Sequence, residues 1–458
     1  MLVLLAGCAR FTPRPISPAQ SAAELDARTL DNPAFRQFLE KNLHRRFDIW
    51  PPQSWDFETL NLAALYYHPS LAVARAQWEG AEGGEKTAAQ RPNPVVSAVP
   101  GYSANPQGPT PWLPGVNFDI PIETMGKRKY RKARAEHLSE SARLNIATTA
   151  WQVRSNLRTS LIDNASARQR QDLLQKQVSL QQQIVESLLE RLEEGEISSS
   201  ELSLVRIALA RAQLDLADAR RLSADARARV ADAIGVPVKA LDGVELDYEL
   251  SASHPTAEQL MSAELRGWAL QNRADVLGAL ADYAASQSAL QLEIAKQYPD
   301  IHLGPAYQYD EADNKFSLAI TAELPILSQN QGPIAEAEAH RTEAAAKFAA
   351  LQARVISDID RAVVGYRVSQ ENLATLGALA TAQKKQSDSV QAQVQAGAAD
   401  RLDLLNSQIE LSASALIQLD GQVRAQQAFG ALEDAIQRPI EAVSPALTSA
   451  QPKKETKP

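Results

Sequence analysis

The chain has 458 residues, with 47 Lys and Arg against 55 Asp and Glu, and 45% of its residues are hydrophobic. This composition excludes wholesale disorder and a polytopic helical membrane protein, which would need repeated apolar runs of about 20 residues, while the net charge of −8 argues against a nucleic-acid-binding protein. Because only 5% of the residues are aromatic and 20 are glycine, an all-β fold is also disfavoured, and we expect a mainly helical protein.

The single cysteine, Cys8, follows a short apolar start. The run Leu5-Ala6-Gly7-Cys8 resembles the bacterial lipobox, in which a cysteine after a small residue is acylated and becomes the mature amino terminus. Residues 1–7 would then be the remnant of a lipoprotein signal, although they lack its usual basic segment. Ala9 stands where an aspartate would retain a lipoprotein in the inner membrane. The resemblance to the lipobox therefore implies lipid anchoring in the outer membrane of a Gram-negative bacterium.

A proline-rich lead segment occupies residues 8–55, and the first half of a repeated plan follows at 56–250. Its strands are expected at about 95–102 and 116–122, and its helices at about 57–67, 70–90, 124–194 and 199–234. No proline interrupts 124–194, which at ~1.5 Å per residue predicts a rod of roughly 100 Å.

The same order of elements returns at 251–441. Strands are expected at about 301–307 and 316–324, and helices at about 257–271, 273–297, 333–395 and 402–437. Pro121 matches Pro325, and Gly195 matches Gly397, at a nearly constant offset. This repeat indicates a two-fold duplication rather than the three domains that the length alone suggests. Residues 442–458, rich in Pro, Lys, Ser and Thr, are expected to form a disordered tail.

Apolar and polar residues alternate along the strands, as in Val116-Asn117-Phe118-Asp119-Ile120. This pattern fits a half-buried sheet or a transmembrane barrel, and the lipoprotein signal favours the barrel. Four strands cannot close a barrel, because about eight are needed and open edges are not tolerated in lipid. We therefore expect the chain to oligomerise. Apolar residues spaced alternately three and four apart, as over 202–219, are typical of coiled coils, and a coiled-coil lipoprotein without a pore is the alternative.

The duplicated order of elements resembles the TolC-like outer membrane factor family, the exit ducts of tripartite efflux pumps and type I secretion systems. The most specific signatures are the strand-to-helix segment Phe118–Arg128, its counterpart Leu324–Gly332, and the turns around Gly195 and Gly397. The resemblance covers about Phe57 to Ile440. It implies a mainly α fold with a small transmembrane β part, in which a homotrimer forms one twelve-stranded β-barrel that continues into a long α-helical periplasmic tunnel.

The resemblance also implies partners. These are a periplasmic adaptor protein, an inner-membrane transporter of the resistance-nodulation-division (RND) or ABC type, and outer-membrane lipid. The stretch Glu123–Arg128 is most similar to the branch that exports heavy-metal cations. Metal cations or drugs are thus the expected cargo, and protein export by a type I secretion system is an alternative.

Site residues follow from the resemblance. Pro121 and Pro325, where strands pass into long helices, would form the barrel–tunnel hinge. Carboxylates at the closed tunnel end would form the periplasmic gate, namely Glu201, Asp400 and Asp403. Helix capping explains the spacing of these residues equally well. Ala399 and Asn406 stand where the family often has a basic and an acidic residue, so its ion-pair lock is only partly carried over.

The helical turns at 191–204 and 395–406 would be the contact sites for the adaptor, because exposed heptad helices suit helix-in-groove contacts. The residues expected to make these contacts are Arg191, Gly195, Ser198, Leu202, Gly397 and Leu404.

No motif for catalysis accompanies these features. None of the six histidines has the spacing of a zinc site, and we find no nucleophile elbow or phosphate-binding loop. We expect no enzyme activity, no cofactor and no metal centre. The basic run 127–132 is expected to face solvent or lipid headgroups.

Overall fold

The computed structural model describes residues 11–106, 108–251, 255, 262–310 and 312–440. Cys8 with its lipobox and the predicted tail at 442–458 lie outside the described residues. The chain divides into two compact units. The helical unit comprises Met1–Pro69, Gln152–Ala257 and Gly365–Ala431, and the sheet unit comprises Ser70–Trp151, Glu258–Val364 and Leu432–Pro458. Each unit takes segments from both predicted halves, so the halves are not separate compact bodies, and the duplication stays a prediction.

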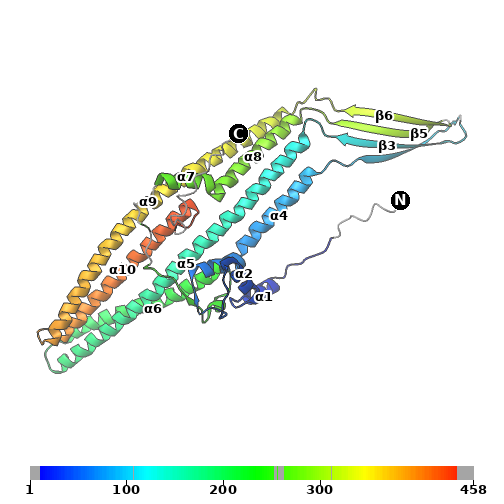
Figure 1. Cartoon of the computed structure of the whole chain (residues 1–458). Helices are drawn as coiled ribbons and strands as arrows, with labels where there is room; N and C mark the ends of the chain where they lie inside the picture. The colour runs from blue at the N-terminus through cyan, green and yellow to red at the C-terminus, as the bar shows by residue number, and fades with distance from the viewer. Residues whose placement is uncertain (1–10, 107, 252–254, 256–261, 311, 441–458) are drawn as a thin grey trace. The chain divides into compact units, whose positions relative to one another are not determined.

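The sheet unit contains four antiparallel strands in the order β2-β3-β5-β6 (Figure 1). Their bounds are Val95–Tyr102, Trp112–Ile122, Ile301–Asp310 and Asp313–Ala322. Two hairpins, one from each half of the sequence, are joined in the middle by the pairing of β3 with β5. Within the described residues this sheet is open at both edges, and the twelve-stranded trimeric barrel stays a prediction.

The strands differ from the predicted bounds at the hairpin ends. The prediction ended one strand at 307 and resumed at 316, whereas β5 and β6 remain paired out to Asp310 and Asp313. Their polar side chains are satisfied by partners, since Lys315 Nζ lies 2.6 Å from Asp310 Oδ2 and the Tyr307 hydroxyl donates to Asn314 Oδ1 at 2.7 Å. Cross-strand pairs of this kind stabilise a ladder. Polar residues therefore did not end the strands here.

The long helices agree closely with the predicted ranges. They are α5 (Lys127–Glu193), α6 (Ser199–Ile234), α9 (Gln331–Gln395) and α10 (Arg401–Ile436). Shorter helices accompany the sheet, namely α4 (Pro69–Ala89), α7 (Ser262–Asn272) and α8 (Ala274–Ala295), and α3 spans Phe57–Tyr67 in the helical unit. The predicted apolar stripe of α6 is buried at Leu202, Ala212, Leu216 and Ala219. Three of these residues pack against Leu174 and Val178 of α5.

The lead segment contains two helices that the sequence analysis missed, α1 (Pro18–Asp26) and α2 (Pro33–Leu43). Each begins with a proline after a capping Ser or Asn, and proline is favoured at the first helical position because its missing N–H has no intrahelical partner there. Prolines that suggested an irregular segment are thus helix starts. Phe35 and Leu39 of α2 are fully buried, which makes this segment part of the helical unit's core.

The lead segment is fixed to the helical unit by Arg28. Its Nη1 donates to the carbonyl oxygens of Tyr67, at 2.9 Å, and Gly235, at 2.7 Å. Gly235 ends α6 with φ +86°, and a Cβ there would lie 2.9 Å from His68 Cα. Only glycine suits this close, left-handed position. Short strands β1 (Ser54–Trp55) and β4 (Glu245–Leu246) pair in parallel nearby in the same unit.

Candidate functional sites

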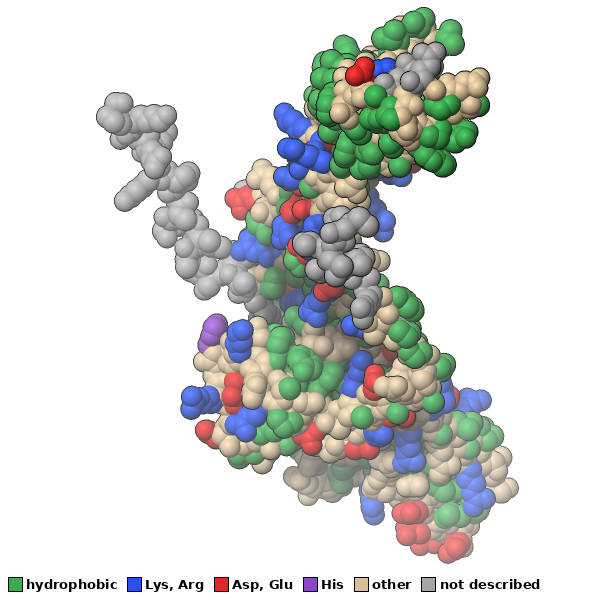
Figure 2. Space-filling model, turned by 90° about the vertical axis from the view of Figure 1, so that its right-hand side faces the viewer, with side chains coloured by type: hydrophobic (Ala, Val, Ile, Leu, Met, Phe, Trp, Pro, Cys, Tyr) green, Lys and Arg blue, Asp and Glu red, His purple; other side chains and the backbone are tan. Residues whose placement is uncertain are grey.

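One face of the four-stranded sheet is apolar and open. Alternation and register put one set of side chains together on it: Val96, Ala98, Tyr102, Trp112, Val116, Phe118, Ile120, Ile301, Leu303, Tyr307, Phe316, Leu318 and Ile320. Phe316 is 80% exposed and Ile320 71%. Figure 2 shows hydrophobic side chains gathered over the sheet at the top of the view. We call these residues the apolar face, and its extent requires lipid or a partner to cover it.

Both edges of this sheet are unpaired among the described strands. β2 is bonded only to β3, and β6 only to β5. Such edges present free N–H and C=O groups that readily pair with another chain. Two aromatic pairs on the apolar face, Tyr102 with Trp112 and Tyr307 with Phe316, have ring centroids 5.3 Å apart. Aromatic residues of this kind flank the lipid-facing band of transmembrane barrels.

The opposite face of the sheet is polar over much of β3, β5 and β6, while β2 adds the exposed Val95 and Val99 to it. Asn117 and Asp119 of β3, His302 of β5, and Ser317 and Thr321 of β6 share it. His302 Nδ1 lies 2.8 Å from Asp119 Oδ1. A sheet with one apolar face and a largely polar one suits a boundary between an apolar and an aqueous environment.

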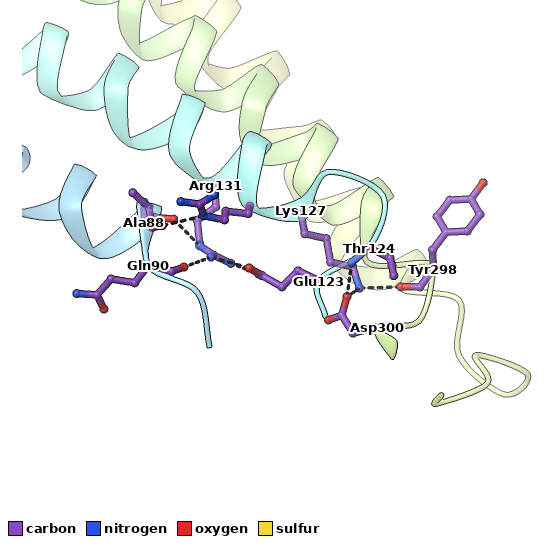
Figure 3. A network of polar contacts seen from close by, with 10 residues as sticks. Ala88, Gln90, Glu123, Thr124, Lys127, Arg131, Tyr298 and Asp300 are labelled. Carbon is purple, nitrogen blue, oxygen red and sulfur yellow. Dashed lines mark hydrogen bonds and ion pairs between the residues drawn. The ribbon is translucent and has the colours of Figure 1, made fainter. Parts of the chain in front are cut away.

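A buried cation holds the junction between β3 and α5 (Figure 3). Lys127 is 8% exposed, and its Nζ donates to the carbonyl oxygen of Tyr298 at 2.7 Å and to Asp300 Oδ1 at 2.8 Å. Thr124 N also donates to Asp300 Oδ1, at 2.9 Å. Burial raises the pKa of Asp300, but the hydrogen bonds from Lys127 and Thr124 outweigh it, so its pKa lies below the usual value. These contacts join the start of α5 to the residues just before β5.

Arg131 and Arg128 hold the end of α4 at the same junction. Arg131 Nε donates to the Ala88 carbonyl at 3.0 Å, and its Nη2 donates to the Gln90 carbonyl at 2.9 Å, while the guanidinium also pairs with Glu123 (Figure 3). Arg128 donates to the Ala89 carbonyl at 2.7 Å. Cations commonly cap the unpaired carbonyls at a helix carboxyl end. The expectation that the run 127–132 faces solvent or headgroups is therefore wrong for Lys127 and Arg131.

The predicted hinge prolines occupy different positions. Pro121 lies within β3, opposite His302, one residue before the strand ends. Pro325 lies in the connection between β6 and α9. Near the start of α9, Asn330 has φ +61° and its Nδ2 donates to the Glu293 carbonyl at 2.8 Å and to Glu293 Oε2 at 3.0 Å. A hinge function for either proline stays a prediction.

The two helical turns use different caps. Gly195 follows the carboxyl end of α5 and has φ +77°. Ser198 Oγ accepts a hydrogen bond from Glu201 N at 3.3 Å and so caps the start of α6. Gly397, with φ +73°, ends the α9 side. There Asp403 Oδ2 accepts from Asp400 N at 3.1 Å. Both glycines supply a left-handed residue after a helix, and Ser198 and Asp403 each make a capping hydrogen bond.

One ion pair joins the two turns within the helical unit. The Arg191 guanidinium, at the end of α5, donates to the Asp400 carboxylate, just before α10. This hydrogen bond lowers the pKa of Asp400 below its ordinary value. Of the three predicted gate carboxylates, Asp400 is thus the one that binds a cation from the other turn. Glu201 lies at the start of α6 and, within the part of the chain that the structure describes, makes no hydrogen bond or ion pair with Arg191.

The predicted adaptor contacts differ in accessibility. Leu202 is 3% exposed and packs inside the unit, and Leu404 is half-buried. Leu204, which is 68% exposed, and Ile207, 51%, present the apolar surface of this turn instead. Leu204 and Ile207 are three residues apart, a spacing that puts two side chains on the same side of a helix. Leu202 instead belongs to the apolar heptad stripe of α6, and that stripe is buried.

Among the described residues, no cluster of three or more His, Cys, Asp and Glu side chains could hold a metal ion. In the same part of the chain, no helix has an apolar stretch long enough to cross a bilayer.

Comparison with known proteins gives a consistent result. The sequence profile of the outer membrane efflux protein family matches residues 62–236 and 265–436. The cobalt-zinc-cadmium resistance protein CzcC of Cupriavidus metallidurans is 24% identical over 265 residues, which cover 57% of this chain and 61% of that relative. The chain thus matches less than two thirds of the relative's length.

Two solved structures are similar in fold. The outer-membrane channel OprN has a TM-score of 0.71 at 17% identity, with 95% of this chain and 99% of that chain covered. The outer membrane protein VceC from Vibrio cholerae has a TM-score of 0.68 at 19% identity, with 83% and 95% covered. At these identities the likeness shows the fold alone.

Proposed function

This chain belongs to the outer membrane efflux protein family, and from that premise we propose that it forms the outer-membrane exit duct of a tripartite efflux pump. The observation that carries the proposal is the four-stranded sheet with an open apolar face and two unpaired edges. An edge in lipid costs several kcal/mol for each unsatisfied backbone group. Pairing β6 of one copy with β2 of the next removes both edges.

Three copies would give twelve strands, enough to close a barrel around a water-filled interior. The apolar face would then contact lipid and the polar face would line the pore. Solute passes through such a duct passively, so the chain needs no active site. The energy for transport comes from an inner-membrane transporter of the RND or ABC type, linked through a periplasmic adaptor.

The helical turns form the periplasmic gate in this proposal. The Arg191–Asp400 pair holds the two turns of one copy together, while Asp403 and Glu201 add negative charge near the same end. Rings of carboxylates contributed by several copies attract cations and repel one another. The adaptor would bind the same turns, with Leu204 and Ile207 as its apolar contacts.

Divalent metal cations are the proposed cargo, because the curated relative is described as a cobalt-zinc-cadmium resistance protein. Acylation of Cys8 would anchor each copy to the outer membrane. A lipobox cysteine is diacylated, and two acyl chains together give stable anchoring.

Edge-to-edge pairing can be tested with engineered cysteines. Ser97→Cys on β2 is combined in turn with cysteine at Lys315, Ser317 or Ala319 on β6, all on the polar face. Oxidation should produce covalent trimers in at least one combination. The matched control carries cysteines at Asn117 and Ala306, which lie opposite each other inside one sheet, and should form only an intrachain bond.

Conductance measurements complete the test. Purified protein reconstituted in a planar bilayer should form ion-conducting channels. Failure to cross-link between copies, together with the absence of conductance, would favour the alternative of a pore-free coiled-coil lipoprotein.

A further inference from the structure

The His302–Asp119 pair lies on the polar face of the sheet, two residues along the chain from Asp300 of the junction. His302 is opposite Pro121 on β3 and Thr321 on β6, so it sits on an interior strand of the sheet. Its side chain is 41% exposed and that of Asp119 is 49% exposed. The imidazole is therefore held in place by a neighbouring strand and is still accessible to solutes.

The hydrogen bond selects which ring nitrogen is available. An ionised carboxylate only accepts hydrogen bonds, so in a neutral His302 the proton resides on Nδ1, which faces Asp119 Oδ1 at 2.8 Å. Nε2 then carries the free lone pair. Metal-binding histidines in proteins are oriented in this way, with the second ring nitrogen donating to a carboxylate. Among the described residues, His302 Nε2 takes part in no hydrogen bond or ion pair.

Charge and space around the imidazole also favour a cation. Asp300 lies two residues earlier, but Lys127 balances its charge at 2.8 Å. The charge left next to His302 is therefore that of Asp119. Gly304, the next residue on the same face, has no side chain, and its cross-strand neighbour is the small Ala319. Hydrated ions can reach Nε2 from the solvent side.

We propose that His302, oriented by Asp119, is a transit site for divalent transition-metal cations on the wall of the duct. The inference rests on the proposed function, because it takes the polar face as the pore lining. Imidazole suits copper, nickel, cobalt and zinc, whereas magnesium and calcium prefer oxygen ligands. One imidazole completed by water binds weakly, and weak binding is what conduction requires, since the ion must leave as readily as it enters.

The first experiment records current through reconstituted channels while Cu²⁺, Ni²⁺, Co²⁺ or Mg²⁺ is added. We expect partial block in the order Cu²⁺ > Ni²⁺ > Co²⁺, the order of imidazole affinity, and no block by Mg²⁺. His302→Ala should abolish the block. Asp119→Asn should weaken it about 10-fold to 100-fold, the range typical of losing the carboxylate behind a metal-binding histidine. His340→Ala is the matched control, because His340 is exposed on α9 and also lies beside carboxylates.

The second experiment does not depend on conductance. Electron paramagnetic resonance of Cu²⁺ added to the detergent-solubilised protein should show one imidazole-coordinated equivalent per chain that His302→Ala removes and His340→Ala retains. Loss of conductance with this signal intact would refute the duct but not the site. Channels that conduct while both the ordered block and the signal survive His302→Ala would overturn the metal site and leave the duct standing. Absence of the signal in the unsubstituted protein would also overturn the site.

Discussion

Replacing Lys127 with methionine tests the junction between the sheet and α5. Methionine keeps the length and apolar stem of the side chain but donates no hydrogen bond. Asp300 and the Tyr298 carbonyl each lose their bond to Nζ. Hydrogen bonds to charged groups contribute ~1.5–3 kcal/mol each, and the Asp300 side chain is 33% exposed, so water compensates part of the loss. We expect a net loss of about 2 kcal/mol in the free energy of unfolding.

The assay is thermal unfolding of the detergent-solubilised protein, followed by circular dichroism. For a unit of roughly this size each kcal/mol lowers Tm by about 2–4 °C, so Lys127→Met should lower Tm by about 4–8 °C if the sheet unit unfolds as one. Lys129→Met is the matched control. It removes the same charge two residues along α5, where the side chain is exposed, and should change Tm by less than about 2 °C, as is usual for surface substitutions.

The pH dependence provides a second check on Lys127. The pKa of Asp300 is lowered in the folded protein, so its ionised form stabilises the fold above the unfolded-state pKa of about 3.9. This contribution is lost as the pH falls through the lower, folded-state value. The Tm difference between the native protein and Lys127→Met should therefore shrink below about pH 4. Equal effects of Lys127→Met and Lys129→Met, or a difference that does not change between pH 7 and pH 3, would refute this account.

Three further predictions concern other parts of the chain. Gly235→Ala and Gly195→Ala both place a side chain at positive φ, which costs ~1–2 kcal/mol, but only the former brings a Cβ to 2.9 Å from His68 Cα. Urea unfolding should show Gly235→Ala to be the more destabilising by a further ~1–3 kcal/mol, and equal losses would contradict the close packing. Arg191→Gln should raise the resting conductance at neutral pH, and native channels should approach that level as the pH falls through the lowered pKa of the partner carboxylate; unchanged conductance would remove the ion pair from the gate. Cys8→Ser should abolish incorporation of labelled palmitate, and retained label would exclude the lipobox.

Cationic side chains within the basic run 127–132 have different surroundings in the folded protein, although they look alike in the sequence. Lys127 and Arg131 are engaged by carbonyls and carboxylates from segments before and after them. Lys129, between them, is exposed. Because α5 turns by about 100° per residue, neighbouring positions in one basic run face different surroundings. The number of charges in the run therefore cannot distinguish a buried, hydrogen-bonded cation such as Lys127 from a solvent-exposed one such as Lys129.

Local patterns in the sequence determined most of the elements. The alternation over 116–120 predicted a strand where β3 lies, and the helix expected at 199–234 coincides with α6, Ser199–Ile234. The open apolar face follows from the same alternation, because successive side chains of a strand point to opposite faces. These signals depend on residues within one or two turns of each other, and a single sequence displays them directly.

The tertiary structure alone decided which distant groups meet. Lys127 and Asp300 are 173 residues apart, and Arg191 and Asp400 are 209 apart. No short-range spacing encodes such pairs, because they arise when two hairpins from different halves of the chain pack together. The same holds for the helices of the lead segment, whose apolar side chains become a core only when the rest of the helical unit covers them. The sequence by itself thus determined the strands, the long helices and the need for a covering partner, while long-range packing determined the ties between the elements.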